Sequence, residues 1–192
     1  MELKTTFAIV ATIIGVPSFI PYILDTFKRK TQPHVYTWLI WTILQATGVI
    51  AMYNNGAGIG ILALAIGTFF CAFICIISFK YGTKNITPFD TMCLVGALIS
   101  IGVYVFLHQP LLSVILVSAI DFMGFLPTLR KSWAEPHTET VSMYAFFLVS
   151  GLFSILALKD YSAITLLYPL TLIAINSIST VVIIIRRFSL SS

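Results

Sequence analysis

The stretch Phe19-Ile20-Pro21 occurs a second time as Phe125-Leu126-Pro127, and a basic cluster follows each proline. A shift of 106 positions lays the second half of the 192-residue chain over the first without a gap. The same shift places Val35 on Val141, Trp38 on Tyr144 and Trp41 on Phe147. Internal repetition determines architecture, so the sequence predicts two copies of one structural unit.

The composition is that of a membrane protein. Hydrophobic residues make up 58% of the chain and charged residues only 9%, whereas a soluble domain carries roughly 25% charged residues. A surface so poor in charge must be solvated by lipid. The net charge of +4 is then explained by loops held on the cytoplasmic side. No basic stripe interleaved with aromatic residues is left over, so no nucleic-acid partner is expected.

Seven apolar stretches are long enough to cross a bilayer, which takes about 20 residues. The predicted helices are 5–26, 35–54, 57–79, 89–107, 111–129, 139–158 and 161–185. We therefore expect an all-α membrane protein. Its predicted parts are a first three-helix bundle (1–84), a linker helix (85–109) and a second three-helix bundle (110–192).

Basic residues predict the orientation. With the N-terminus outside, the cytoplasmic side holds nine of them, and only Lys4 and Lys159 lie outside. The nine are Lys28, Arg29, Lys30, Lys80, Lys84, Arg130, Lys131, Arg186 and Arg187. A three-helix unit ends on the side opposite its start, so the linker helix must cross once more. The prediction is a 3+1+3 parallel repeat, N-out and C-in, with the two bundles related by an axis along the membrane normal.

Three strongly hydrogen-bonding side chains lie deep inside predicted helices. Asp121 is the one acid far from any helix end, and Asn176 and Gln45 are expected at a similar depth. Ionisable groups in the membrane are costly, so Asp121 is a candidate for proton coupling or for substrate binding. The alternative for all three is a structural role, as hydrogen bonds between helices. Trp41 lies one turn deeper than Trp38 and is the fourth candidate for the substrate site.

The prolines and aromatic residues lead to further predictions. Pro17, Pro21, Pro127 and Pro169 lie inside helices, where each removes a backbone hydrogen bond. Pro21 and Pro127 repeat, which favours paired hinges, with Pro17 beside the first; static kinks are the alternative. Trp38 and Tyr144 are expected in the aromatic belt at the inner interface.

The residues do not support metal binding, catalysis or cofactor binding. Cys71, Cys75 and Cys93 lie in apolar runs without accompanying His or acidic residues, which predicts no metal site. No second catalytic group accompanies Asp121, so we expect neither an enzyme nor a cofactor.

Two three-helix copies, each with a proline near the inner end of its first helix, a basic loop and an aromatic-rich second helix, resemble the SWEET/PQ-loop family. The residues that carry the resemblance are 21–31 and 127–131. It implies a transporter that moves a solute by alternating access through a central pocket, and Asn176 matches a pocket asparagine of the sugar-carrying members. Neither proline is followed by glutamine, and Phe70 stands opposite Asn176.

The predicted function is transport of a small polar solute, a sugar or an amino acid, through a multi-pass protein of a plasma, inner or organelle membrane. The alternative is a cargo or peptide receptor of the same fold that does not turn over. The expected partners are the solute and the lipid bilayer. Because seven helices can enclose a pathway alone, a homo-oligomer is possible but not required.

Overall fold

The computed structural model describes residues 2–29, 33, 35–82, 87–134, 136 and 141–191. Side chains are described throughout these ranges except at positions 90, 126–128, 130, 131, 134 and 191. Lys30 and Lys84, two of the predicted cytoplasmic residues, therefore lie outside the described residues, as do the side chains of Arg130 and Lys131.

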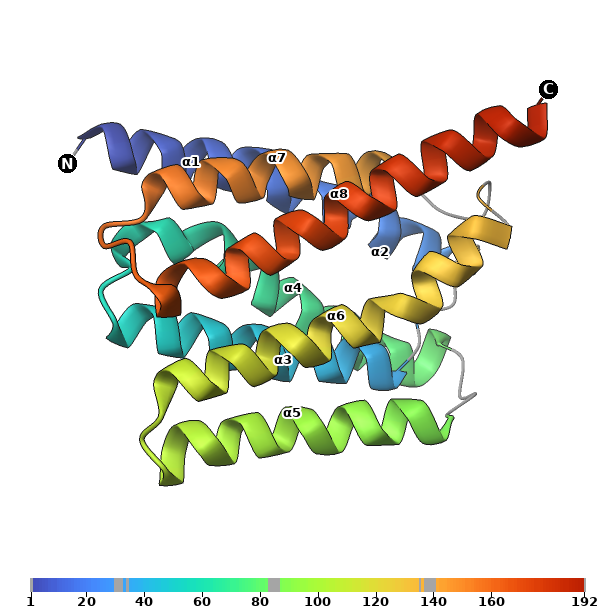
Figure 1. Ribbon diagram of the computed structural model, residues 1–192. Coiled ribbons are helices and arrows are strands. Elements are labelled where there is room, and N and C mark those ends of the chain that lie inside the picture. The colour runs from blue at the N-terminus through green and yellow to red at the C-terminus, as the bar shows by residue number, and fades with distance from the viewer. Residues whose placement is uncertain are drawn as a thin grey trace.

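Within the described ranges the chain is all-helical and makes seven helical spans (Figure 1), as predicted. The first span is α1 (Glu2–Gly15), a 3₁₀ segment η1 (Val16–Ser18) and α2 (Phe19–Phe27). It is followed by α3 (Val35–Asn54), η2 (Gly58–Ile61) with α4 (Leu62–Tyr81), and α5 (Pro88–Phe106). The last three are α6 (Pro110–Ala134), α7 (Val141–Ala157) and α8 (Ala163–Ser191).

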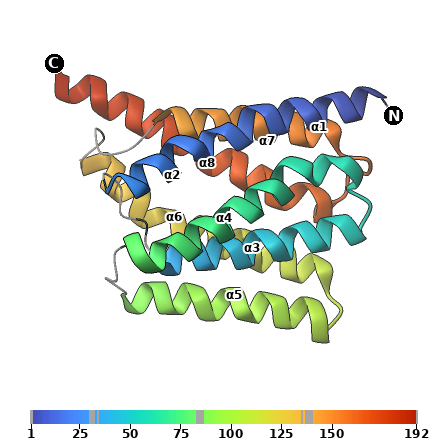
Figure 2. The ribbon, with the colours of Figure 1, turned by 180° about the vertical axis from the view of Figure 1, so that it is seen from behind.

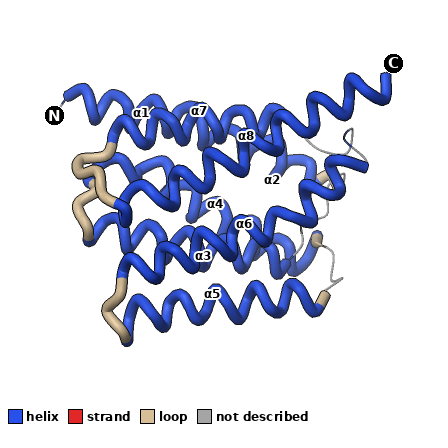
Figure 3. Tube along the Cα trace, in the orientation of Figure 1, coloured by secondary structure: helices blue, strands red, loops and turns tan. Residues whose placement is uncertain are grey.

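The helices run side by side, with short connections at the ends of the bundle (Figure 3), and the two termini lie at opposite ends (Figure 1). In one group α4 packs against both α1 and α3 (Figure 2). In the other, α8 packs against both α6 and α7. The groups meet where α1 contacts α7 and α3 contacts α6, while α5 covers α3 and α6 from outside.

The turns between helices follow from their residues. Gly56 and Gly58 have φ angles of +86° and +62°, a region open to glycine at little cost. Gly56 lies between α3 and η2, and Gly58 begins η2, near the predicted break between helices 35–54 and 57–79. The Lys159 amide donates to the carbonyl of Ala57 at 2.9 Å, so this turn is hydrogen-bonded to the α7–α8 turn.

Apolar side chains cover the outside of the bundle as well as its interior. Phe69, Ile76 and Phe106 are 68%, 67% and 80% exposed, which water would oppose and lipid favours. Four helical stretches are long and apolar enough to cross a membrane: Glu2–Phe27, Val35–Asn54, Gly58–Tyr81 and Ala163–Leu190. Shorter apolar helices are Thr91–Phe106, Pro110–Phe125 and Val141–Ala157. These features indicate a multi-pass membrane protein.

Candidate functional site

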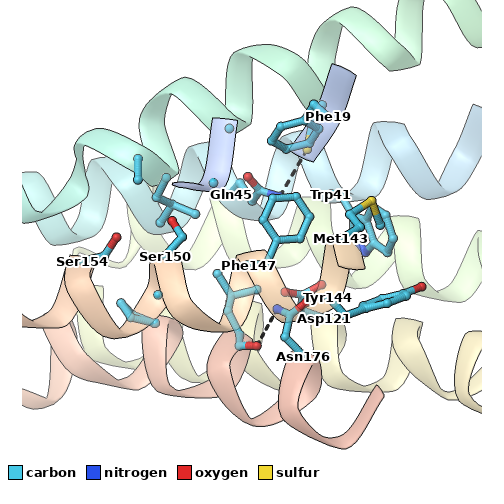
Figure 4. Close-up of a pocket in the computed structure, with 18 of the residues that line it drawn as sticks. Phe19, Trp41, Gln45, Asp121, Met143, Tyr144, Phe147, Ser150, Ser154 and Asn176 are labelled. Atoms are coloured by element: carbon cyan, nitrogen blue, oxygen red, sulfur yellow. Dashed lines mark hydrogen bonds between the residues drawn. The ribbon is translucent and has the colours of Figure 1, made fainter. Parts of the chain in front are cut away.

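A cavity of about 140 Å³ lies in the middle of the bundle, with room for several water molecules. Among the described residues, every helix except α5 contributes to its lining. The wall is mostly apolar and is interrupted by a few polar groups (Figure 4). A concave apolar site with few convergent polar groups is the usual form of a small-molecule site.

All four residues that the sequence predicts for substrate binding line this cavity. They are Asp121 from α6, Asn176 from α8, and Gln45 and Trp41 from α3. Asp121 and Asn176 are only 2% and 6% exposed. Depth along each helix was the reason to group them in the sequence, and the fold adds the common orientation.

The side-chain amide of Asn176 has one polar atom with a hydrogen-bond partner and one without. Its Nδ2 donates to the carbonyl of Leu172 at 2.7 Å. Its Oδ1 is buried and has no hydrogen-bond partner among the described residues. A buried polar atom without a partner costs about 1–3 kcal/mol, and buried groups left in this condition are uncommon in folded proteins. Oδ1 is therefore an unused hydrogen-bond acceptor, to which a donor group of a ligand would bind.

Gln45 is held by a contact that the sequence did not predict. Its Nε2 lies 3.3 Å from Sγ of Cys71 on α4, and Cys71 also lines the cavity. The sequence pattern predicts only that Cys71 lies in an apolar run. Cys71, Cys75 and Cys93 are buried free thiols. In the described part of the chain, no group of three His, Cys, Asp or Glu residues gathers to hold a metal ion.

Behind Asp121 lies Tyr168 of α8, which sequence reasoning missed. Tyr168 is fully buried, and its hydroxyl interacts with the nearby carboxyl of Asp121 but falls short of a hydrogen bond. The ring packs on α3 at Gly48, where a Cβ atom would come within 2.7 Å of it. The glycine thus makes room for the tyrosine that backs the carboxyl. A tyrosine inside an apolar run offered no signal of this role.

The aromatic side chains form one wall of the cavity. Trp38 and Tyr144 are each 4% exposed and line it, so the prediction that they belong to an interfacial belt is wrong. Trp38 Nε1 donates to the Tyr22 hydroxyl at 3.2 Å, which satisfies its polar edge inside the protein. The ring contacts continue from Trp38 to Trp41 at 5.2 Å and from Trp41 to Phe125 at 5.4 Å.

A second set of rings completes this wall. Phe19 stacks on Phe70 at 5.2 Å and contacts Phe147 at 5.1 Å. Away from the aromatic wall, small and polar residues line the cavity, among them Ser150 and Ser154 on α7 (Figure 4). Ser150 donates to the Ala11 carbonyl at 2.7 Å and so ties α7 to α1. Neither serine is predicted from the sequence to line the site, because single serines are common inside membrane helices.

The predicted hinge prolines lie in different local structures. Pro17 lies in η1, where the first span is interrupted, and Pro21 lies in the first turn of α2. A hollow of about 300 Å³ between this interruption and α7 is lined by Pro17, Ser18 and Pro21. Pro127 falls within the unbroken helix α6, and its side chain lies outside the described residues. Pro169, inside α8, lines the central cavity.

At the N-terminal end of the bundle, Lys4 joins α1 to the α7–α8 turn. Its Nζ donates to the carbonyls of Leu158 and Lys159, at 2.6 and 3.0 Å. The ammonium also lies 5.4 Å from the ring centre of Tyr161. Lys4 does not line the cavity. Its contacts hold the two helix groups together at this end.

Comparison of the chain with family models, with curated proteins and with solved structures finds no match. The cavity and the side chains around it are therefore what points to a function.

Proposed function

We propose that the protein is a transporter that moves a small polar solute across the membrane by alternating access through the central cavity. The observation that carries the proposal is the convergence of Asp121, Asn176 and Gln45 on one cavity. In that space the Asn176 Oδ1 has no protein partner among the described residues. Asp121 is the proposed proton-coupling group, because ionisable residues inside membrane proteins mark ion and substrate pathways.

The lining of the cavity supports a repeated architecture. Six pairs of lining residues are separated by the 106 positions of the sequence repeat. They are Gly15 and Asp121, Phe19 and Phe125, Trp38 and Tyr144, Trp41 and Phe147, Gln45 and Gly151, and Ala63 and Pro169. Equivalent positions of two similar units that face one space are what a transporter built from two repeats requires.

The packing of the helices supports the same proposal. In each group the third helix packs against both the first and the second: α4 against α1 and α3, and α8 against α6 and α7. The linker role proposed for α5 agrees with its absence from the cavity lining among the described residues. We therefore propose the 3+1+3 parallel repeat, N-out and C-in, and membership of the SWEET/PQ-loop type of transporter. Sugars and amino acids are the solutes that this resemblance implies.

Alternating access requires that the groups move relative to each other. The interruption at Pro17, beside Pro21, is the proposed hinge of the first group, and the hollow of about 300 Å³ next to it leaves space for bending. Pro127 is the proposed counterpart in α6. A peptide receptor is less well supported, because the cavity lining contains no Lys, Arg or His among the described residues to hold a peptide carboxylate.

The test is transport by the purified protein in liposomes that contain a pH-sensitive dye. Sugars and amino acids are offered with and without a pH gradient. We expect solute flux, with proton movement that requires both solute and Asp121. Asp121→Asn and Asn176→Ala are expected to reduce flux by about ten- to a hundredfold, since a hydrogen bond to a charged group contributes about 1.5–3 kcal/mol.

Matched controls are Asp25→Asn and Asn54→Ala, which change the same residue types away from the cavity. Wild-type flux in both cavity variants would show that the site is wrongly assigned. Solute flux without proton movement would leave a carrier in which Asp121 has a structural role.

A further inference from the structure

The charge of the cavity is unbalanced. Among the described residues that line it, Asp121 carries the one carboxyl group, and no Lys, Arg or His accompanies it. An ionised carboxyl buried without a partner is very costly. A cation bound in the cavity would stabilise the ionised form of Asp121, whereas without such an occupant the carboxyl is expected to hold a proton.

The neighbouring amide adds a second acceptor. A carbonyl oxygen can only accept, so the contact with Leu172 O fixes the nitrogen of Asn176 on that side. The Oδ1 atom is left over, buried and without a hydrogen bond in the described part of the chain. Because both side chains line one cavity, a carboxylate and an amide oxygen are both available to a group bound there.

Aromatic rings enclose the same part of the cavity. Trp41, Phe125, Tyr144 and Phe147 all line it. The faces of such rings attract cations, tryptophan most strongly, and cages of this kind bind quaternary ammonium groups. Apolar rings alone would not favour an inorganic ion, which needs oxygen ligands on most sides.

From this arrangement we propose that the transported solute is a small organic cation without a carboxylate, a primary amine or a methylated ammonium. The proposal rests on the transport function above and names its substrate class. The cationic head lies between Asp121 and Asn176, against the rings of Trp41 and Phe147. The cavity volume of about 140 Å³ admits only a small molecule.

The other solute classes fit this charge pattern less well. A zwitterionic amino acid brings a carboxylate that finds no cationic partner among the described residues of the cavity lining and is repelled by ionised Asp121. A neutral sugar brings no charge to stabilise the ionised form of Asp121, which then needs a proton. A primary ammonium satisfies the carboxylate, the unpartnered acceptor Oδ1 and the ring faces together, and a quaternary ammonium satisfies the carboxylate and the ring faces.

Two probes of the same shape isolate the charge. Choline is compared with 3,3-dimethylbutan-1-ol, in which carbon replaces the charged nitrogen. Binding to the purified protein is measured by calorimetry, and liposome uptake is measured for choline, ethanolamine, glucose and glycine. We expect choline to bind at least tenfold more tightly than its neutral analogue and to enter the liposomes, as does ethanolamine.

Variants connect the binding to the cavity. Asp121→Asn is expected to weaken choline binding at least tenfold, whereas Asp25→Asn leaves it unchanged. Trp41→Leu is expected to weaken it roughly three- to tenfold. The matched control is Trp133→Leu, because Trp133 is 56% exposed and contacts Arg186 outside the cavity.

The outcomes separate this proposal from the transport function. Uptake of glucose or glycine with no binding of choline overturns the cation proposal and leaves the transporter. Choline binding that depends on Asp121, without flux of any solute, supports the cation site and contradicts transport. Equal binding of choline and its neutral analogue overturns the cation proposal, and absence of both binding and flux overturns both.

Discussion

The first span of the chain and α6 begin from similar sequences and end as different structures. Both contain the Phe-x-Pro stretch, at Phe19 and at Phe125. The first span is interrupted by η1 at residues 16–18, whereas α6 continues unbroken from Pro110 to Ala134. One of the residues that differ is Pro17, whose counterpart at the repeat distance is Met123. The repeated proline alone therefore does not break a helix here, and the additional one accompanies the break.

The two spans also differ in what they present to the cavity. Gly15 and Asp121 occupy equivalent positions and line the same space. Gly15 lets α1 approach α7, since a Cβ atom there would come within 2.5 Å of Ser150 Oγ. Asp121 supplies the carboxyl. The two spans thus differ in charge at this pair of positions, and in helix continuity at residues 16–18.

Met123→Pro carries the largest effect expected in this comparison. It places in α6 the residue that accompanies the break of the first span, and a proline in a helix interior costs about 3 kcal/mol or more. We expect a marked fall in the free energy of unfolding in detergent, measured by thermal or urea unfolding. A neutral result would mean that α6 tolerates a break as the first span does, and that Pro17 is not what distinguishes them.

The reverse change tests the same point by another measurement. Pro17→Ala restores a backbone N–H at the interruption, so the amides around residues 16–20 should exchange hydrogen more slowly as η1 becomes α-helical. If Pro17 is also a hinge, turnover falls while solute affinity stays the same. Unchanged exchange would assign the break to the surrounding packing.

Gly15→Ala is expected to have the next largest effect. The new Cβ meets the Ser150 side chain, which must leave its hydrogen bond to Ala11 O. Overpacking with loss of that bond costs about 1–3 kcal/mol. Gly124→Ala is the matched control in α6, because nothing lies within 4 Å of its added Cβ. That variant should be stabilised by roughly 0.5–1 kcal/mol, and equal shifts in both variants would contradict the close approach of α1 and α7.

Ser18→Ala should have the smallest effect. The Ser18 hydroxyl donates to the Gly15 carbonyl at 2.5 Å and so satisfies an acceptor at the interruption. Its loss should cost about 1 kcal/mol, measured as a small decrease in the unfolding midpoint. An effect as large as that of Gly15→Ala would mean that the hydroxyl, and not the glycine, is what fixes this segment.

The sequence predicted where the helices are, and much of what faces the cavity, but not which face of each helix is buried. Charges, prolines and glycines end the helices, so the predicted span 35–54 coincides with α3. Hydrophobicity does not distinguish a lipid-facing side from the interior, because both are apolar. Trp38 was therefore misplaced, and Tyr168 behind Asp121 was missed. Asp121, Asn176 and Gln45 were found because a polar group in lipid is costly wherever it points.

The contact between the indole rings of Trp38 and Trp41 has a practical consequence. Their centroids are 5.2 Å apart and their planes are inclined by 82°, and both rings line the cavity. Two indoles at this separation couple their strong far-ultraviolet transitions and should produce a paired circular dichroism band there. The third tryptophan of the chain, Trp133, lies exposed near the end of α6. The native protein thus carries an optical reporter of cavity occupancy that needs no added label.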